Sequence, residues 1–384
     1  MANRNLGSAR KAKNDEFYTQ YADIEKEMNA YLEYDPDVFK GKTVLLPCDD
    51  PEWSNFTKYF AQNFDKFGLK KLISTSYAPN SKPKEIPYQP TLFEIHSPDF
   101  DESKTHSNGK IFTLTKDNTG DEVINFEDLE WSYLEGDGDF RSEEVTALRD
   151  ESDLIITNPP FSLFRDFLIW ATCGEKQFSL IGNKNAVTYK EVFPLIRDNK
   201  LWIGKTPMSQ DLLFRVPKNR EEEFVNSGKE GSAWRNVDGE ILGRSSSVWF
   251  TNIEHGKRHE PLPLMTEADN VKFSKHKDIK EVGYQQYDNY DALEVPFTDA
   301  IPSDYEGVMG VPISFLDKYN PDQFEIIGFW NAGKAGEEIG ASDTEAFSAG
   351  KKIVWNGPTV NKETKYFRIL IRHLRNTSSA LQSS

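Results

Sequence analysis

The sequence predicts an α/β fold: a doubly wound sheet followed by a C-terminal domain of mixed α/β structure. Over roughly the first 250 residues, short apolar runs alternate with segments of helical periodicity, which is typical of a sheet with helices on both faces. After about His255 the pattern changes to short strands separated by proline and glycine. At 384 residues the chain is long enough to form two hydrophobic cores.

The change of pattern near His255, together with the two chain ends, divides the sequence into four predicted segments. Residues 1–13 are expected to be a basic N-terminal arm, 14–254 the sheet domain, 255–375 the second domain and 376–384 a disordered tail.

The first strands of the sheet domain follow an amphipathic helix. Ile24, Met28 and Tyr31 recur at helical spacing before Asp35-Pro36 ends that helix. Thr43–Leu46 is then a predicted strand, and a predicted helix over residues 52–64 leads to a second strand, Leu72–Tyr77.

The first domain is organised around the run from Asp153 to Phe161. Leu154–Thr157 predicts a buried strand, and Pro159-Pro160 ends it because proline has no N–H to continue a sheet ladder. Ligands of open α/β sheets bind at the carboxyl ends of the strands. The side chains of Asn158 and Phe161 are therefore expected at a ligand site.

The residue types at Asn158, Pro159, Pro160 and Phe161 suit a planar amino group. The Asn158 side-chain oxygen and the Pro159 carbonyl could accept both hydrogens of such a group and turn its lone pair out of the ring. Phe161 could stack on a base that has been extruded from a duplex. A plain strand-ending turn is the alternative.

This tetrapeptide resembles the catalytic motif of amino-group methyltransferases that use S-adenosylmethionine, and the surrounding sequence is similar to the EcoRI-type adenine-specific DNA methyltransferases. The resemblance extends through Lys13–Thr19, Leu46–Pro51, Gly136–Arg141 and Gly310–Asp317 and covers most of the chain. It implies a Rossmann-like methyltransferase sheet and methyl transfer to N6 of a flipped adenine in double-stranded DNA. It also implies either a partner restriction endonuclease or an orphan role.

By the same resemblance, ten residues would hold the cofactor: Phe17, Tyr18, Thr19, Pro47, Cys48, Asp49, Asp50, Asp139, Phe140 and Asn158. Asp49 and Asp50 would bind its ammonium group, and Asp139 would accept from its adenine amino group while Phe140 packs on that ring. The alternatives are simple packing for the N-terminal aromatic residues, a helix cap for Asp50 and a glycine-rich turn around Asp139.

Two features depart from the family pattern. The turn after the first strand has no glycine, so the backbone cannot approach a ligand as closely there. The strand Leu72–Tyr77 does not end in an acidic residue, so the contact to the cofactor ribose is unassigned.

The net charge of −16 opposes a general attraction to nucleic acid, so DNA contacts must come from local basic patches. Residues 99–153 carry most of the imbalance, with 17 acids against 5 bases; a solvated surface is expected there, and a DNA-mimicking or partner-binding face is the alternative. Two stretches are basic, residues 1–13 and 351–375. DNA contacts are expected from Arg4, Arg10, Lys11, Lys13, Lys257, Arg258, Lys351 and Lys352.

Composition argues against several other classes of protein. Cys48 and Cys173 cannot build a disulfide framework, and six scattered histidines offer no zinc spacing, so no metal is expected. There is no run of 18 apolar residues, and residues 1–13 lack the apolar core of a signal peptide. A cytoplasmic protein, bacterial or phage-encoded, is expected.

Two glycine-containing stretches are expected to be loops, Asn236–Gly243 and Ala332–Gly350, the second of them mobile until substrate binds. The basic, aromatic second domain is expected to recognise DNA, with a purely stabilising domain as the alternative. Two other functions stay open: methylation of RNA or of a protein glutamine amide, and a non-catalytic DNA-binding or DNA-mimicking role.

Overall fold

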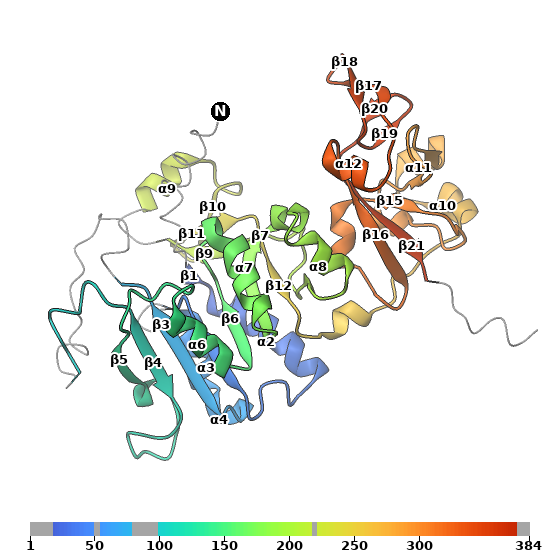
Figure 1. Ribbon diagram of the computed structural model, residues 1–384. Coiled ribbons are helices and arrows are strands. Elements are labelled where there is room, and N and C mark those ends of the chain that lie inside the picture. The colour runs from blue at the N-terminus through green and yellow to red at the C-terminus, as the bar shows by residue number, and fades with distance from the viewer. Residues whose placement is uncertain (1–17, 50–53, 79–98, 217–220, 375–384) are drawn as a thin grey trace, which may run out of the picture. The chain divides into compact units, whose positions relative to one another are not determined.

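The computed structural model describes residues 18–49, 54–78, 99–216 and 221–374, and they form two compact units (Figure 1). Unit 1 comprises the described residues up to Ala186 together with Ile203–His255. Unit 2 comprises Val187–Trp202 and the described residues from Gly256 onward. The sequence predicts a single boundary after residue 254 and does not assign residues 187–202 to the second unit.

Unit 1 is built on an eight-stranded mixed sheet. In spatial order its strands are β5 (Glu130–Tyr133), β4 (Lys110–Leu114), β3 (Lys71–Ser76), β2 (Thr43–Leu46), β6 (Leu154–Thr157), β7 (Gln177–Asn183), β12 (Ser247–Thr251) and β8 (Trp202–Ile203). The central strands β3, β2, β6 and β7 are parallel, whereas β4 is antiparallel to β3, β5 to β4 and β12 to β7. The predicted strands over residues 43–46 and 154–157 are confirmed.

The order of these strands changes direction at β2. From β2 the chain moves to β3 on one side, and it later returns to place β6 on the other side of β2. The carboxyl ends of β2 and β6 lead into Pro47 and Asn158, respectively. In open sheets the point where the strand order reverses is where a ligand-binding crevice forms.

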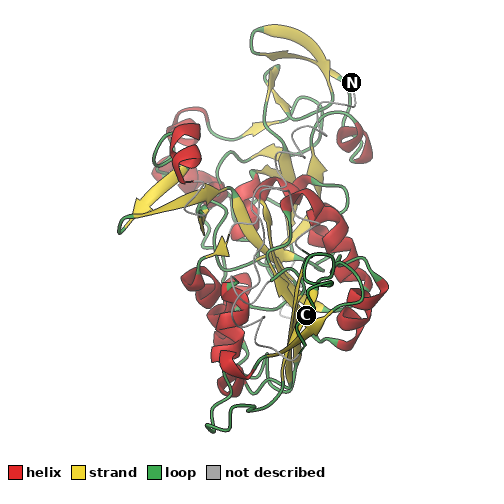
Figure 2. Ribbon diagram, turned by 90° about the vertical axis from the view of Figure 1, so that its left-hand side faces the viewer, coloured by secondary structure: helices red, strands yellow, loops and turns green. Residues whose placement is uncertain are grey.

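Helices cover both faces of this sheet, as Figure 2 shows with the sheet seen nearly edge-on. Trp249 of β12 packs against Phe56 of α3 (Asn55–Gln62), with 5.8 Å between ring centroids. The next residue, Phe250, packs against Phe164 of α7 (Phe164–Cys173) at 5.1 Å. Successive side chains of a strand point to opposite faces, so α3 and α7 lie on opposite faces.

The remaining helices of the sheet join one of these two layers. Residues of α2 (Tyr21–Tyr34) and α4 (Phe64–Phe67) share a buried core with α3. The helix α6 (Glu143–Glu151) is tied to α7 because Arg149 Nη1 donates to the Trp170 carbonyl over 2.8 Å.

A smaller, four-stranded sheet completes unit 1. Its order is β1 (Tyr18–Thr19), β9 (Leu212–Arg215), β11 (Glu240–Ser245) and β10 (Trp234–Val237), and a helix, α9 (Glu221–Ser227), precedes β10. The loop expected over residues 236–243 is wrong, because β10 and β11 form a hairpin. Its turn is Asp238-Gly239, both with positive φ, which is the geometry of a two-residue hairpin turn.

Unit 2 contains two further sheets and short helices. The five-stranded sheet has the order β13 (Gln285–Gln286), β14 (Leu293–Glu294), β15 (Met309–Val311), β21 (Arg368–His373) and β16 (Phe324–Trp330). The four-stranded sheet has the order β18 (Lys351–Trp355), β17 (Thr344–Ser348), β20 (Glu363–Thr364) and β19 (Thr359–Val360). The helices are α8 (Phe193–Arg197), α10 (Glu267–Phe273), α11 (Lys277–Val282) and α12 (Lys334–Glu338).

The loop expected over residues 332–350 is also wrong, since it contains α12 and β17. The stretch is rich in small residues, but its backbone is paired with β18 and β20. Long-range pairing of this kind is not visible in local composition.

A buried ion pair lies in the core of unit 2. Arg368 Nη2 and Nε donate to the two carboxylate oxygens of Glu294 over 2.6 and 3.1 Å, and Tyr287 also donates to that carboxylate. Glu294 is 6 % exposed and Arg368 8 %. Removing one member of such a pair would leave a buried charge without compensation.

Two further findings concern the described residues alone. None of their helices has the length and apolar character needed to cross a membrane. In the same part of the chain, no three His, Cys, Asp or Glu residues come together as a metal site would require.

Candidate functional site at the carboxyl ends of the central strands

Asp49 connects the ends of β2 and β6. It is 6 % exposed, and its carboxylate accepts from Thr157 Oγ1 over 2.6 Å and from Ser54 Oγ over 2.7 Å. Thr157 is the last residue of β6, and Ser54 is the N-cap of α3. The carboxylate therefore fixes the strand that carries Asn158 against the turn that follows β2.

The main chain of Asp49 is held as firmly as its side chain. Its N–H donates to the Thr75 carbonyl over 3.1 Å, and its carbonyl accepts from the hydroxyl of Ser74. Both partners belong to β3. In place of the glycine-rich turn that the family pattern would provide, side-chain hydroxyls from three neighbouring segments define this turn.

The tetrapeptide Asn158 to Phe161 starts where β6 ends. Asn158 is half-buried, and Pro159 is buried. The Phe161 ring makes an edge contact with Phe214 of β9, with 6.5 Å between centroids. The small sheet of unit 1 therefore packs beside this motif.

Thr19 belongs to the same small sheet. It pairs with Phe214, and its carbonyl accepts from Asn55 Nδ2 over 2.8 Å. Thr19 is 3 % exposed, and within the described part of the chain its hydroxyl has no hydrogen-bond partner. The contact with Asn55 brings Thr19 next to the start of α3, whose N-cap Ser54 holds Asp49.

The turn Gly136-Asp137-Gly138 covers the carboxyl end of β3. A Cβ atom on Gly138 would lie 2.4 Å from the Ser76 carbonyl oxygen, and Gly138 has φ +85°. Asp137 accepts from Ala78 N–H through its carbonyl over 2.8 Å. Only glycine fits this close approach of the two backbones. The conformation of Gly138 then sets the direction of the chain at Asp139 and Phe140.

Asp139 is bound to a neighbouring guanidinium. Arg141 Nε and Nη2 donate to its two oxygens over 2.9 and 2.6 Å, and this pairing lowers the pKa of Asp139. Tyr77, directly after β3, lies 3.5 Å from the same carboxylate. Burial, and then the charges of Asp137 and Asp139, raise the pKa of Tyr77 to about 12, so its hydroxyl stays a donor at neutral pH.

Phe140 points into the protein. It is 5 % exposed and packs against Phe167 and Trp170 of α7, at 4.9 and 5.6 Å between ring centroids. Its packing fixes the backbone of the neighbouring Asp139, and little of the side chain is exposed to a ligand.

An ion network lies at the carboxyl end of β7, next to β6. Lys184 Nζ and Arg244 Nη2 each donate to Asp211 over 2.6 Å, and all three side chains are less than a quarter exposed. Burial acts to raise the pKa of Asp211, but the hydrogen bond and charge of Lys184, together with Arg244, outweigh it and lower that pKa. The network ties the small sheet to the main one.

Several predicted site residues lie outside the described residues: Arg4, Arg10, Lys11, Lys13, Phe17 and Asp50. For Tyr18 the structure gives the backbone pairing with Arg215. Pro47 is buried, and Cys48 is half-buried and in no disulfide within the described residues. The alternative role of Asp50 as a helix cap is corrected, because α3 begins at Asn55 and is capped by Ser54.

The DNA contact expected from Arg258 is corrected as well. This side chain is 6 % exposed, its guanidinium carbon lies 3.9 Å from the Trp202 ring centroid, and Nη2 donates to Asn199 over 3.0 Å. A guanidinium buried in this way is not available to phosphates. Lys257 is half-buried, whereas Lys351 and Lys352 are exposed.

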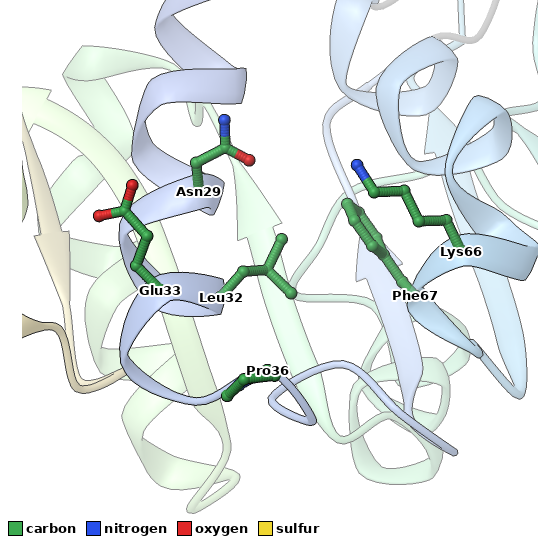
Figure 3. Close-up of a pocket in the computed structure, with 6 residues that line it drawn as sticks. All are labelled: Asn29, Leu32, Glu33, Pro36, Lys66 and Phe67. Carbon is green, nitrogen blue, oxygen red and sulfur yellow. The ribbon is translucent and has the colours of Figure 1, made fainter.

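A surface hollow in unit 1 is separate from this site. Leu32 of α2 and Phe67 of α4 face one another across it, and Asn29, Glu33, Pro36 and Lys66 complete its lining (Figure 3). Pro36 precedes β2 and Phe67 precedes β3, so the hollow lies at the amino ends of the parallel strands. It is not a candidate for the same ligand.

Sequence reasoning missed four residues that shape the site: Ser54, Tyr77, Arg141 and Asp211. Ser54 had a local signal, because serine is a favoured N-cap. Tyr77 and Asp211 act through contacts with residues that are distant in the chain, and Arg141 acts through a pairing with Asp139 whose geometry the sequence pattern does not display.

Comparison with known proteins identifies the family. A family model described as adenine-specific methyltransferase EcoRI matches residues 5–374. The chain belongs to this family. The Type II methyltransferase M.EcoRI of Escherichia coli is 40 % identical over 373 residues, covering 97 % of both chains. M.MpnI of Mycoplasma pneumoniae is 34 % identical over 323 residues, 83 % of both chains, and no solved structure matches the chain.

Membership of the EcoRI methyltransferase family makes the chain an enzyme of the adenine-specific methyltransferase class. The family match spans both units, so unit 2 is part of the family's common architecture.

Proposed function

We propose that this protein is a site-specific DNA methyltransferase that transfers a methyl group from S-adenosylmethionine to N6 of an adenine flipped out of double-stranded DNA. The observation that carries the proposal is the bond between Asp49 and Thr157, which joins the ends of β2 and β6 where Asn158-Pro159-Pro160-Phe161 begins. It places an anionic group and an amide-bearing motif together at the point where the strand order reverses.

The residues present fit the cofactor. Asp49 offers a buried carboxylate to an ammonium group, and Thr19, whose carbonyl accepts from Asn55 at the start of α3, offers a buried hydroxyl. Asp139, presented by the glycine turn over β3, would accept from the adenine amino group. Tyr77 supplies a hydroxyl near a strand end that lacks the usual acid, and we assign it to the ribose. When bound, the cofactor supplies an electrophilic methyl group.

The chain's own residues act on the target amine. Asn158 Oδ1 and the Pro159 carbonyl accept its two hydrogens, which turns the nitrogen lone pair out of the base plane. Phe161, held by Phe214, stacks on the flipped base. The tie from Asp49 to Thr157 fixes the position of Asn158, so positioning and dipoles aimed at the developing charge supply the catalysis.

The rest of the assignment follows from the same proposal. The strand order and the helices on both faces support a Rossmann-like, doubly wound sheet over residues 14–254. Residues 255–375 would form the DNA-recognition domain, and the N-terminal arm, Lys257, Lys351 and Lys352 would contact phosphates. The enzyme would act in the cytoplasm, either beside a restriction endonuclease that cuts the same site or alone.

The test is transfer of radiolabel from S-adenosylmethionine to genomic DNA that lacks adenine methylation, followed by nucleoside analysis. Asn158→Ala is the control, because it removes the amide and leaves the fold of β6. Labelled N6-methyladenine formed by the wild type alone supports the proposal. Cofactor binding without transfer to DNA would redirect the search to RNA or protein substrates, and no cofactor binding would refute the enzyme assignment.

A further inference from the structure

Two strands of unit 2 form a ribbon with an unusual exposed surface. β17 and β18 pair antiparallel, with Phe347 opposite Lys352 and Glu345 opposite Val354, and the ribbon turns at Ala349-Gly350 (Figure 1). Directly opposed residues share a face, so these four side chains form one row, here called the outer face. On it Phe347 is 46 % exposed and Val354 73 %.

The opposite face of the ribbon faces the protein. Ala346 is fully buried, and its partner Ile353 is half-buried. The exposure of Phe347 and Val354 is therefore a property of one face and not of a frayed hairpin.

Buried amides fix the base of the ribbon, which is the end opposite its turn. Asn289 Nδ2 donates to the carbonyls of Ser342, before β17, and of Gly357, after β18, over 3.1 and 3.0 Å. Asn356 exchanges hydrogen bonds with the main chain of Gly333, and its carbonyl accepts from Trp330 Nε1 over 2.9 Å. A ribbon with such anchors presents its outer face in a fixed orientation, as a recognition element requires.

The surroundings of the ribbon are basic. Residues 344–366 contain four lysines and two glutamates, in a chain whose net charge is −16. One lysine, Lys352, pairs with Glu345 over 2.6 Å. Lys351 at the ribbon turn and Lys362 in the next turn are exposed, and Tyr366 close by is 86 % exposed.

We propose that the β17–β18 ribbon enters the major groove of double-stranded DNA and contributes to the choice of site. This groove admits two β-strands, and β20 meets β17 at a single residue pair, Phe347 with Glu363. Lys351 and Lys362 would contact phosphates on its walls, while Phe347 and Val354 contact base edges, where an apolar side chain distinguishes the thymine methyl group. This inference rests on the proposed function, and it assigns base recognition to a segment that composition had indicated as a loop.

The experiment uses two pairs of variants of the full chain. The first removes the apolar groups, Phe347→Gln with Val354→Thr, and its control changes the same two residue types at other exposed positions of unit 2, Phe273→Gln with Val282→Thr. The second removes charge, Lys351→Gln with Lys362→Gln, and its control is Lys277→Gln with Lys280→Gln on α11. Phe273 and Val282 are 59 % and 61 % exposed, and all four lysines are exposed.

Two measurements separate the roles. Anisotropy titration of a labelled duplex against salt gives the number of phosphate contacts, and sequencing of methylated genomic DNA gives the preferred site. The lysine pair should lower the slope of log affinity against log salt by about two, equally for all sequences. The apolar pair should leave the slope unchanged and reduce discrimination against one-base variants of the site by about tenfold. Both controls should match the wild type.

Equal binding and equal site preference in the ribbon variants and their controls would overturn the inference. It would also fall if the wild type sediments as a dimer that the apolar pair converts to a monomer, because the outer face would then be a self-association surface. If the wild type binds DNA but transfers no methyl group, the proposed function fails. The slope of log affinity against log salt and the preference of binding for one sequence then still test the role of the ribbon. A wild type that does not bind DNA at all refutes both.

Discussion

Thr157→Val removes one hydroxyl from the centre of the site while keeping the shape of the side chain. The hydroxyl donates to a carboxylate that is 6 % exposed, over 2.6 Å. A hydrogen bond to a charged group contributes about 1.5–3 kcal/mol, and Asp49 would keep Ser54 as its remaining hydroxyl donor. In a unit of this size, the loss of this much unfolding free energy corresponds to a fall in melting temperature of about 3–12 °C.

Thr172→Val is the matched control. Its hydroxyl donates over 2.8 Å to the Leu168 carbonyl within α7, a neutral bond that contributes about 0.5–1.5 kcal/mol. Denaturant unfolding of Thr157→Val, of Asp49→Asn and of the double variant then gives their coupling free energy. We expect more than about 1 kcal/mol, since both changes remove the same bond.

The same variant tests the link to catalysis. Because Thr157 directly precedes Asn158, its release should lower turnover by about ten- to a hundredfold and leave the cofactor dissociation constant within a few-fold. Two results would refute the view that this bond positions the motif. One is a loss of unfolding free energy in the double variant that equals the sum of the two single losses within about 0.5 kcal/mol, and the other is unchanged turnover of Thr157→Val.

Four further outcomes are expected. Asn158→Ala should lower methyl transfer by a hundredfold or more while calorimetric cofactor binding changes only a few-fold; comparable turnover would exclude the amide from the reaction. Gly138→Ala should weaken cofactor binding and cost about 1–3 kcal/mol of unfolding free energy, whereas Gly120→Ala, which has positive φ but open space around it, should cost less and leave binding unchanged. The lowered pKa of Asp211 means that its contribution to stability is present above its ordinary pKa of about 3.9 and is lost as pH falls through the lower folded value. Asp211→Asn should therefore flatten the fall in unfolding free energy below about pH 4, and an unchanged acid profile would contradict this. Glu294→Gln should destabilise unit 2 by about 3–5 kcal/mol in chemical unfolding, and a loss below about 1 kcal/mol would show that the ion pair is not a net anchor.

The parts of the site that were predictable are those with a strong local signal. The strand ending at Thr157 was predicted to the residue, because an apolar β-branched run stopped by two prolines allows few other structures. The contact between Asp49 and Thr157 was not predictable, since it depends on β2 and β6 being neighbours although 107 residues separate the last residue of β2, Leu46, from the first residue of β6, Leu154.

The two wrong loop predictions have different physical reasons. The hairpin around Asp238-Gly239 has a clear turn signal, an Asp-Gly pair between strand-compatible residues. This signal predicts a hairpin more strongly than the polar composition of the stretch predicts a loop. The strand β17 had no such signal, because its sequence Thr-Glu-Ala-Phe-Ser buries only Ala346 fully. Its structure comes from pairing with β18 and β20.

The excess of acidic residues is compatible with DNA binding because phosphate binding depends on the local charge of a surface and not on the net charge of the chain. In the acidic segment, Asp128 is 1 % exposed and accepts from the backbone N–H groups of Asn118, Thr119 and Asn125 over 2.8–2.9 Å. Such a carboxylate organises a turn and contributes little to a repulsive surface. Lys351 and Lys362 beside the β17–β18 ribbon are exposed instead. A phosphate backbone responds to the local field within about one Debye length, some 8 Å at physiological salt, so this basic patch can act on DNA independently of the net charge.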